Sequence, residues 1–267
     1  MIILISVCFG FIIFLIIEYS FLLPQVKGLP VLMYHKVTED NKREDYLTIS
    51  VSRLKQQIDY LAKKGYTPIL LSDLLNYHFK QVDLPVKPVL ITFDDGYKDN
   101  YTHLYPLLQQ YNMKASVFLV AKFLEEGSVA EKESEYLSFD DLKKMALPYV
   151  EFGLHSYDHK NYATLSPAEA DADIKKMKEV FDKEGVNYQP CFAYPYGAYP
   201  KKDTEKQLLL MKTLQSNNIQ LAFRIGNRYN KLPLETTFFI KRIDIKGTDS
   251  MFRFKAKMRT GRSKLFS

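Results

Sequence analysis

Short apolar segments alternate with helix-like segments along most of this 267-residue chain, and that alternation constrains its fold more than any other feature. The strand-like segments are LPVLMYH (29–35), YTPILL (66–71), KPVLITF (87–93), KASVFLV (114–120), YVEFGLH (149–155), CFAYPYG (191–197), IQLAFRIG (219–226) and FFIKRIDI (238–245). Between them, helical periodicity is clear, as over 52–65 and 166–185. Repeated alternation of this kind indicates parallel strands joined by crossover helices. We therefore predict an α/β fold, a distorted (β/α) barrel of about seven to eight strands.

The first residues depart from this pattern. Residues 2–17 carry no charge, and extension through Leu23 reaches the roughly 20 apolar residues that span a bilayer. A cleaved signal peptide is the alternative, but no basic residue precedes the apolar run and no small-residue cleavage site precedes Leu29. We predict a transmembrane anchor (1–23), a short linker (24–28), a main domain (29–250) and a basic C-terminal tail (251–267). Whether the N-terminal segment is cleaved stays open.

The net charge of +6 comes largely from residues 253–264, six of which are Lys or Arg. Such a stretch is typical of a solvated terminal helix and tail. The alternative is attraction to an anionic surface, such as lipid headgroups or a phosphate-rich wall polymer. No base-reading motif accompanies the charge, so we expect no nucleic-acid partner. The two cysteines, Cys8 in the anchor and Cys191 in an apolar run, are not placed to form a disulfide.

Two adjacent aspartates end one buried strand-like segment, VLITFDDGY (89–97). A buried strand excludes carboxylates that have no partner. Neighbouring carboxylates also repel each other unless a cation lies near or one of them is protonated. The ordinary explanation is an Asp-Gly turn whose carboxylates lie in water. Whether the two aspartates instead belong to a functional site depends on the other polar residues of the chain.

Other polar side chains also follow predicted strands. In parallel α/β barrels the functional groups lie on the loops after the carboxyl ends of the strands. The residues at or near such ends are His35, Asp94, Asp95, His155, His159, Tyr196 and Arg242. Three of the five histidines belong to this set, which makes a shared site the better explanation for the two aspartates.

The combination predicts a metal site. The segment HSYDH (155–159) delivers two imidazoles from one loop, and one aspartate of the pair completes a set of three ligands. Two imidazoles and one carboxylate suit a catalytic divalent ion with an open coordination position. We expect Zn²⁺, with Co²⁺ or Ni²⁺ as alternatives. The second aspartate would then accept a proton from the hydrolytic water.

These motifs resemble those of a known family. TFDDG (92–96) and HSYDH (155–159) are similar to the first two motifs of NodB-type polysaccharide deacetylases, carbohydrate esterase family four, and AYPYG (193–197) resembles the third. The resemblance covers roughly 29–250. It implies a metal-dependent hydrolase that cleaves linear amide C–N bonds, removing N-acetyl groups from N-acetylglucosamine residues of a cell-surface or cell-wall polysaccharide.

The resemblance also implies roles for individual residues. Asp94 would be the catalytic base, and Asp95, His155 and His159 would hold the metal. Ser156 would buttress the second motif, and Tyr196 would offer its backbone N–H to the oxyanion.

The chain departs from the family pattern in two respects. Ala193 stands where the third motif usually has Arg, and neither a Trp nor a His follows His159 to supply the usual C-terminal acid. The segment LMYHKV around His35 resembles the segment with which the biofilm poly-N-acetylglucosamine deacetylases open. That resemblance implies that His35 is the general acid. Arg242 is a candidate for the missing guanidinium beside Asp94. The carboxylate partner of the acid stays unassigned.

Two other functions stay open. A glycoside hydrolase would need its two carboxylates about 5–9 Å apart across the scissile bond, and a non-catalytic carbohydrate-binding member of the same fold would need no base. We expect a single-pass cell-membrane protein with an extracytoplasmic catalytic domain. Poly-N-acetylglucosamine, peptidoglycan and other glucosamine-containing wall polymers all stay open as substrates.

Overall fold

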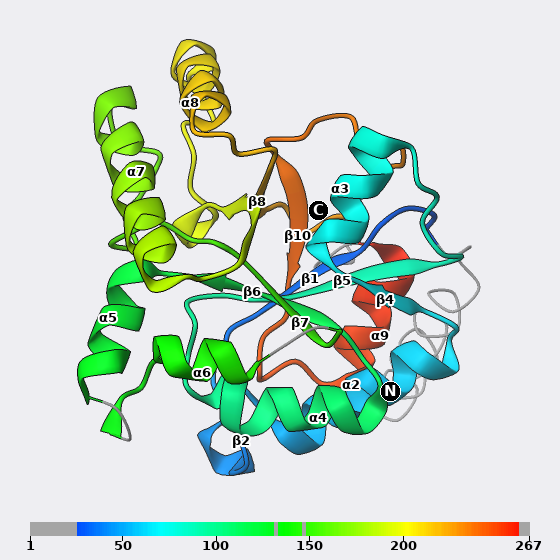
Figure 1. Cartoon of the computed structure of the whole chain (residues 1–267). Coiled ribbons are helices and arrows are strands. Elements are labelled where there is room, and N and C mark those ends of the chain that lie inside the picture. The colour runs from blue at the N-terminus through cyan, green and yellow to red at the C-terminus, as the bar shows by residue number, and fades with distance from the viewer. Residues whose placement is uncertain (1–25, 131–132, 146–147, 262–267) are drawn as a thin grey trace, which may run out of the picture.

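The computed structural model describes residues 26–130, 133–145 and 148–261. Within them, eight strands form one sheet in the order β1-β10-β9-β8-β7-β6-β5-β4, and every pairing is parallel. These strands are β1 (Val31–Tyr34), β4 (Thr67–Ile69), β5 (Pro88–Phe93), β6 (Ala115–Leu119), β7 (Val150–Leu154), β8 (Tyr188–Ala193), β9 (Leu221–Ile225) and β10 (Ile240–Asp244). Because β1 also pairs with β5, seven strands close into a ring, and β4 adds to β5 outside that ring (Figure 1). The predicted barrel is confirmed.

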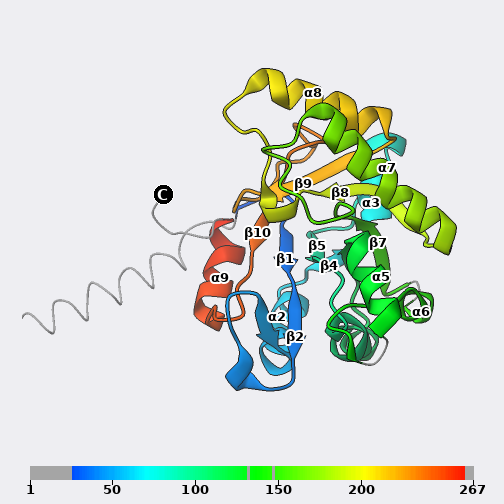
Figure 2. The same ribbon diagram turned by 90° about the vertical axis from the view of Figure 1, so that its left-hand side faces the viewer.

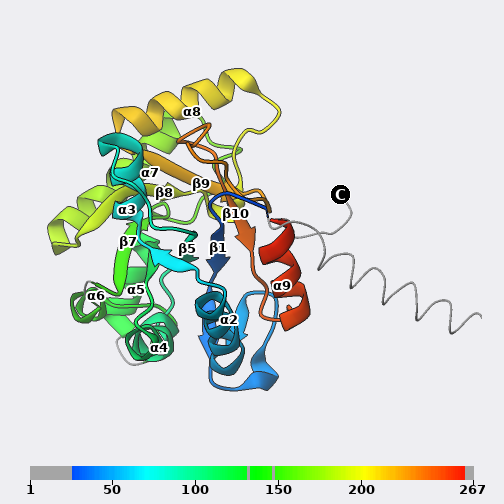
Figure 3. The same ribbon diagram turned by 90° about the vertical axis from the view of Figure 1, so that its right-hand side faces the viewer.

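Helices surround the ring. They are α2 (Val51–Lys63), α3 (Leu71–Lys80), α4 (Tyr105–Tyr111), α5 (Ala121–Ala130), α6 (Phe139–Lys144), α7 (Pro167–Glu184), α8 (Thr204–Ser216) and α9 (Met251–Thr260). Shorter elements are the strand pair β2 (Lys36–Thr38) and β3 (Thr48–Ser50), the turns η1 (Asn41–Arg43) and η4 (Pro195–Gly197), and the π-helical turn η2 (Asn100–Leu104). In Figures 2 and 3, α7 and α8 lie together on one side of the barrel and α9 lies beside α2.

Alternation along the strands separates two apolar cores. On β5, Val89, Ile91 and Phe93 point outward to the helices, whereas Leu90 points into the barrel. The inner core also contains Val31, Phe118, Cys191, Leu221, Phe223 and Ile240. Since side chains alternate along a strand, the residues two and four positions beyond Leu90 also face inward. They are Thr92 and Asp94, and this places the first aspartate of the pair inside the mouth of the barrel.

The basic stretch near the C-terminus is partly buried. Phe254 and Lys257 of α9 are buried, and Lys257 donates a hydrogen bond to the Asp244 carbonyl at 2.6 Å and forms an ion pair with Asp249. A wholly solvated terminal helix was therefore the wrong expectation for 251–260, because these contacts tie α9 to the end of β10. Residues 262–267 lie outside the described residues.

The predicted anchor (1–23) also lies outside the described residues. Within 26–130, 133–145 and 148–261, none of the helices combines the length and apolar character needed to span a membrane.

Candidate active site

Three side chains with metal-binding chemistry meet beyond the carboxyl ends of β5 and β7. Asp95 Oδ1 lies 3.4 Å from His155 Nε2 and 3.2 Å from His159 Nε2. In the described part of the chain, these three residues offer ligand atoms that all lie within 4.8 Å of one another. Asp95 and His155 are buried and His159 is partly exposed. The structure thus brings together the carboxylate and the two imidazoles that the sequence analysis grouped.

Tight turns after the strands present these side chains. Asp95, Ser156 and His159 have φ angles of 75°, 80° and 51°, in the left-handed region that residues other than glycine rarely adopt. Tyr196, in the turn after β8, has a φ of 58°. Backbone strain of this kind gathers at functional sites, because only the surrounding structure can maintain it.

The hydrogen bonding of His155 fixes which of its nitrogens faces Asp95. His155 Nδ1 lies 2.7 Å from the carbonyl oxygen of Ala193. A carbonyl only accepts hydrogen bonds, so Nδ1 carries the proton, and Nε2 of the neutral ring presents a lone pair toward Asp95. Asp95 Oδ1 is buried and receives no hydrogen bond from the described residues. An acceptor without a donor, facing a lone pair of His155 and the nearby Nε2 of His159, is an arrangement that a cation would satisfy.

Asp94 lies beside this group but has a different partner. Arg242 NH1 and NH2 donate to its two carboxylate oxygens at 2.6 and 2.8 Å. Both side chains are buried, with exposed fractions of 2% for Asp94 and 0% for Arg242. Arg242 points inward from β10, two residues beyond the inner-core residue Ile240. A guanidinium from β10 therefore lies directly beside Asp94.

The charges of the site decide its protonation. Burial alone would raise the pKa of Asp94, but the charges of Arg242 and His155 hold it below the ordinary value. Burial likewise opposes ionisation of Asp95, yet the imidazoles of His155 and His159 beside it hold its pKa well below normal. Both carboxyl groups are therefore ionised at neutral pH, which adjacent acids could not achieve without the Arg242 guanidinium and the imidazoles beside them.

His35 lies at the same end of the barrel, between β1 and β2. Its charge adds to the effects that lower the pKa values of Asp94 and Asp95, after burial and their nearer partners. The His35 carbonyl accepts a hydrogen bond from Asn100 Nδ2 at 3.0 Å, and the same amide donates to Asp99 Oδ1 at 2.8 Å. Asn100, which is fully buried at the start of the π-helical turn η2, thus fixes the backbone that carries His35.

A buried aspartate that the sequence analysis missed supports the HSYDH loop. Asp173 Oδ2 accepts hydrogen bonds from Ser156 Oγ at 2.8 Å, from the Tyr157 N–H at 3.1 Å and from the Tyr162 hydroxyl at 2.7 Å. The Ser156 hydroxyl in turn accepts a hydrogen bond from the Lys160 N–H at 3.2 Å. These bonds hold the chain on both sides of the loop that carries His155 and His159.

A sequence signal for Asp173 does exist. It lies on the buried face of α7 together with Ala170, Ile174, Met177 and Phe181. A carboxylate on the apolar face of an amphipathic helix needs a buried partner, and that pattern marks Asp173 as distinct from the exposed acids of the same helix.

Aromatic side chains surround His159. Its ring centroid lies 4.5 Å from that of Tyr196 and 6.0 Å from that of Phe123. Phe123 stacks on Tyr136, and Tyr136 stacks on Tyr97, with centroids 4.2 and 5.3 Å apart. The side chain of Tyr196 is 65% exposed. We call Asp95, His155 and His159 together the metal-binding group. This group opens to solvent through an aromatic rim of the kind that sugar rings pack against.

Comparison with known proteins points to the same family as the sequence motifs. The family model described as "Polysaccharide deacetylase" matches residues 81–214, which include Asp94, Asp95, His155, His159 and Tyr196. The chain is 32% identical over 174 residues to "Putative polysaccharide deacetylase YxkH" of Bacillus subtilis, covering 64% of this chain and 57% of that protein. It is 26% identical over 190 residues to "Poly-beta-1,6-N-acetyl-D-glucosamine N-deacetylase" of Staphylococcus aureus, covering 62% of this chain and 63% of that protein. It therefore spans less than two thirds of the length of either relative.

A solved structure shares the fold over nearly the whole chain. The Streptococcus pyogenes deacetylase PplD superposes with a TM-score of 0.73 at 22% identity, covering 90% of this chain and all of that one. The match to the family model extends over half of the sequence and contains the metal-binding group and Asp94. The chain belongs to the polysaccharide deacetylase family.

Proposed function

We propose that this protein is a metal-dependent N-deacetylase that removes acetyl groups from N-acetylglucosamine residues of a cell-surface or cell-wall polysaccharide. The observation that carries the proposal is the pairing of two adjacent aspartates with different partners. Asp95 faces His155 and His159, while Asp94 is held by Arg242. A metal-dependent hydrolase that acts on amides needs both a cation site and a base beside it.

The residues fit a divalent cation. A buried carboxylate oxygen without a hydrogen bond faces two imidazole nitrogens, and one carboxylate with two imidazoles suits Zn²⁺, Co²⁺ or Ni²⁺. A bound ion would supply Lewis-acid activation of water and of the amide carbonyl.

The other groups of the site divide the proton transfers. Asp94 is ionised and accepts a proton from the attacking water, while Arg242 holds the carboxylate in place. His35 donates a proton to the departing amine. The backbone N–H of Tyr196 donates a hydrogen bond to the developing oxyanion, a contribution of about 3 kcal/mol for donors of this type.

The relatives indicate the substrate class. Those from Staphylococcus aureus carry the name poly-beta-1,6-N-acetyl-D-glucosamine N-deacetylase, and the biofilm polymer of that name is the first substrate to test. Because such polymers lie outside the cell, we further propose that residues 1–23 anchor the chain as a single-pass membrane protein with the barrel on the extracytoplasmic side. Protease digestion of intact cells would then degrade the barrel, and a barrel protected until lysis would refute this orientation.

Acetate release is the direct test. The protein, supplied with Zn²⁺, Co²⁺ or Ni²⁺, is incubated with poly-N-acetylglucosamine, peptidoglycan and chitooligosaccharide, and both acetate and chain length are measured. The proposal requires acetate release without chain shortening, and none from the Asp94→Asn variant. Shortened chains without acetate would identify a glycoside hydrolase, and binding without either product would identify a carbohydrate-binding protein.

A further inference from the structure

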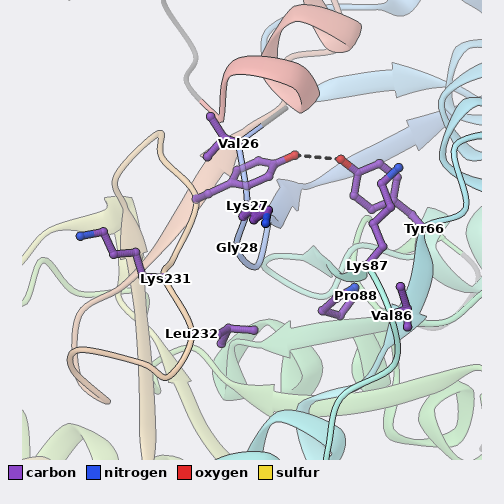
Figure 4. A pocket seen from close by; sticks show the side chains of 10 residues that line it. Val26, Lys27, Gly28, Tyr66, Val86, Lys87, Pro88, Lys231 and Leu232 are labelled. Atoms are coloured by element: carbon purple, nitrogen blue, oxygen red, sulfur yellow. Dashed lines mark hydrogen bonds between the residues drawn. The ribbon is translucent and has the colours of Figure 1, made fainter. Parts of the chain in front are cut away.

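A cavity lies far from the metal-binding group. It has a volume of about 720 Å³ and is lined in part by Val26, Lys27, Tyr66, Lys87, Tyr229 and Lys231. Figure 4 shows Lys87 and Tyr66 on one side of this pocket and Lys231 on the other. The two tyrosine hydroxyls lie 3.2 Å apart, and that of Tyr229 donates to the Met258 carbonyl of α9 at 2.7 Å. We call this cavity the basal pocket.

The basal pocket lies at the end of the barrel opposite the candidate active site. Pro88, which lines it, is the first residue of β5, and Asp94 follows the last residue of the same strand. Tyr66 immediately precedes β4, and Gly28 lies three residues before β1. A strand of six residues is about 20 Å long. The two sites are therefore separated by roughly the length of the barrel.

The pocket combines apolar surface with amines. Val86 on its rim is 91% exposed and Val26 is 41% exposed. Lys87 Nζ lies 4.6 Å from the centroid of the Tyr66 ring, while Lys27 and Lys231 are exposed. Exposed apolar side chains beside lysines are typical of surfaces that lie at the boundary between water and lipid.

Positive charge continues beyond the pocket. The adjoining surface of α2 and α9 is lined by Lys63, Lys64, Lys255 and Arg259, together with Phe252, which is 46% exposed. Glu235 opposes this charge, since it forms an ion pair with Lys231 at 3.5 Å. The residues that line the pocket and this adjoining surface nevertheless include seven Lys or Arg and no Asp or Glu, and the natural complement of such a lining is an anionic surface.

The direction of the chain identifies that surface. The described residues begin at Val26, on the rim of the basal pocket, where its N–H donates to the Arg259 carbonyl at 3.2 Å. The preceding sequence contains the uncharged apolar run 2–17. The apolar run that we propose as a membrane anchor therefore precedes the basic end of the barrel and not the end that carries the metal-binding group.

We propose that the basal pocket docks on an anionic lipid bilayer and takes the phosphate headgroup of an anionic phospholipid between Lys27, Lys87 and Lys231. The barrel then stands on the membrane with the metal-binding group facing away from it, about 20 Å above the lipid surface by the strand length. This proposal does not depend on the chemistry of the active site, because it concerns the opposite end of the barrel.

An environment-sensitive fluorophore at the pocket rim tests the proposal. The full chain is labelled at Val86→Cys in a Cys8→Ser background, where the remaining thiol, Cys191, is buried. The labelled protein is reconstituted in vesicles of phosphatidylcholine alone or of phosphatidylcholine with phosphatidylglycerol. The emission should shift to shorter wavelength only in the anionic vesicles and should return toward the aqueous value in high salt. A label at Leu208→Cys on α8, which is 53% exposed, should report water in both.

Charge variants identify the residues responsible. Each lysine near an anionic surface contributes about fivefold to the affinity for it. The double variant Lys27→Gln/Lys231→Gln should therefore weaken the affinity of the pocket for anionic vesicles about 25-fold. The matched pair Lys202→Gln with Lys206→Gln, two exposed lysines before and at the start of α8, should leave the shift unchanged.

Three results would overturn the proposal. An equal shift in phosphatidylcholine or in detergent would mean that another part of the chain, or a second copy, covers the pocket. A shift produced by inorganic phosphate without vesicles would mean a site for small anions. A shift that survives in the Lys27→Gln/Lys231→Gln variant would mean that these lysines do not bind the headgroup.

Discussion

Arg242 and Asp94 are 148 residues apart in sequence, yet they form a buried, two-bonded ion pair with N–O distances of 2.6 and 2.8 Å. Arg242 enters the barrel from β10 and Asp94 follows β5, and both strands pair with β1. The pair thus joins two strands at the mouth of the barrel and fixes the carboxylate next to the metal-binding group. On the side away from Arg242, the Asp94 carboxylate faces His155, whose Nε2 lies 3.8 Å from Asp94 Oδ2.

Removing the guanidinium should destabilise the fold more than removing both charges. Arg242→Met leaves Asp94 buried without its strongest partner, and breaking a buried pair from one side costs about 3–5 kcal/mol. The double variant Arg242→Met/Asp94→Asn removes the stranded charge and should recover most of that loss. Urea denaturation measures the free energy of unfolding of each. Additive losses in the double variant would mean that the two side chains do not stabilise each other.

The two adjacent aspartates should separate metal binding from turnover. Asp95→Asn removes a ligand, so metal content and acetate release should both fall. Asp94→Asn should abolish turnover while metal content stays near that of the wild type, because Asp94 is held by Arg242 and not by the two imidazoles. Elemental analysis of each purified variant, beside its acetate assay, provides the check. The opposite pattern would mean that the roles of the two aspartates are reversed.

His35 should affect the rate and not the metal. If it protonates the leaving amine, His35→Ala lowers kcat by about 10²–10⁴ with unchanged metal content. His103→Ala is the matched control, because His103 lies in η2 and contacts Glu39 at 3.7 Å. An active His35→Ala variant would show that a different group supplies the proton.

Much of the site could be predicted from local sequence, because its polar side chains come directly after the carboxyl ends of apolar strands. The strand VLITF before Asp94 and the strand VEFGL before His155 are both apolar runs that stop at polar residues, and parallel strands bring such ends together. Arg242 could be grouped with the polar residues near strand ends, but its place beside Asp94 could be proposed only by analogy with the family. Its inward direction follows from alternation once Ile240 is known to face the inner core.

Helix α5 (Ala121–Ala130) was not predicted, for a reason that lies in tertiary structure. Gly127 interrupts its helical pattern. A Cβ at this position would lie 2.1 Å from the Leu137 carbonyl oxygen, so the helix needs glycine for the close approach of another segment. Propensity counts this glycine against a helix, and only the packed structure reveals why it is there.

Asp173 should act on metal affinity through the HSYDH loop. Asp173→Asn keeps the size of the side chain but removes its negative charge. The neutral amide is a weaker acceptor for the three hydrogen bonds from Ser156, Tyr157 and Tyr162. We expect metal affinity to fall about 10–100-fold, the usual effect of losing a partner that orients the ligands. Asp171→Asn, on the same helix and paired with Lys175 at 2.7 Å, is the control. Metal titration of the two variants compares them directly, and equal affinities would show that Asp173 does not orient the loop.

Asp99 should contribute less to the stability of the fold as the pH rises. Burial, with a smaller contribution from Glu135, raises the pKa of Asp99 from 3.8 to about 7, although hydrogen bonds from Val37 and Asn100 oppose the shift. The folded state therefore holds a proton that the unfolded chain releases near pH 4, and the contribution of Asp99 to the free energy of unfolding decreases between about pH 4 and 7 by at most about 4 kcal/mol. Asp99→Asn stays neutral throughout. It should match the wild type near pH 4 and exceed its melting temperature at pH 8, and a constant difference between the two proteins across this range would exclude Asp99 as the titrating group.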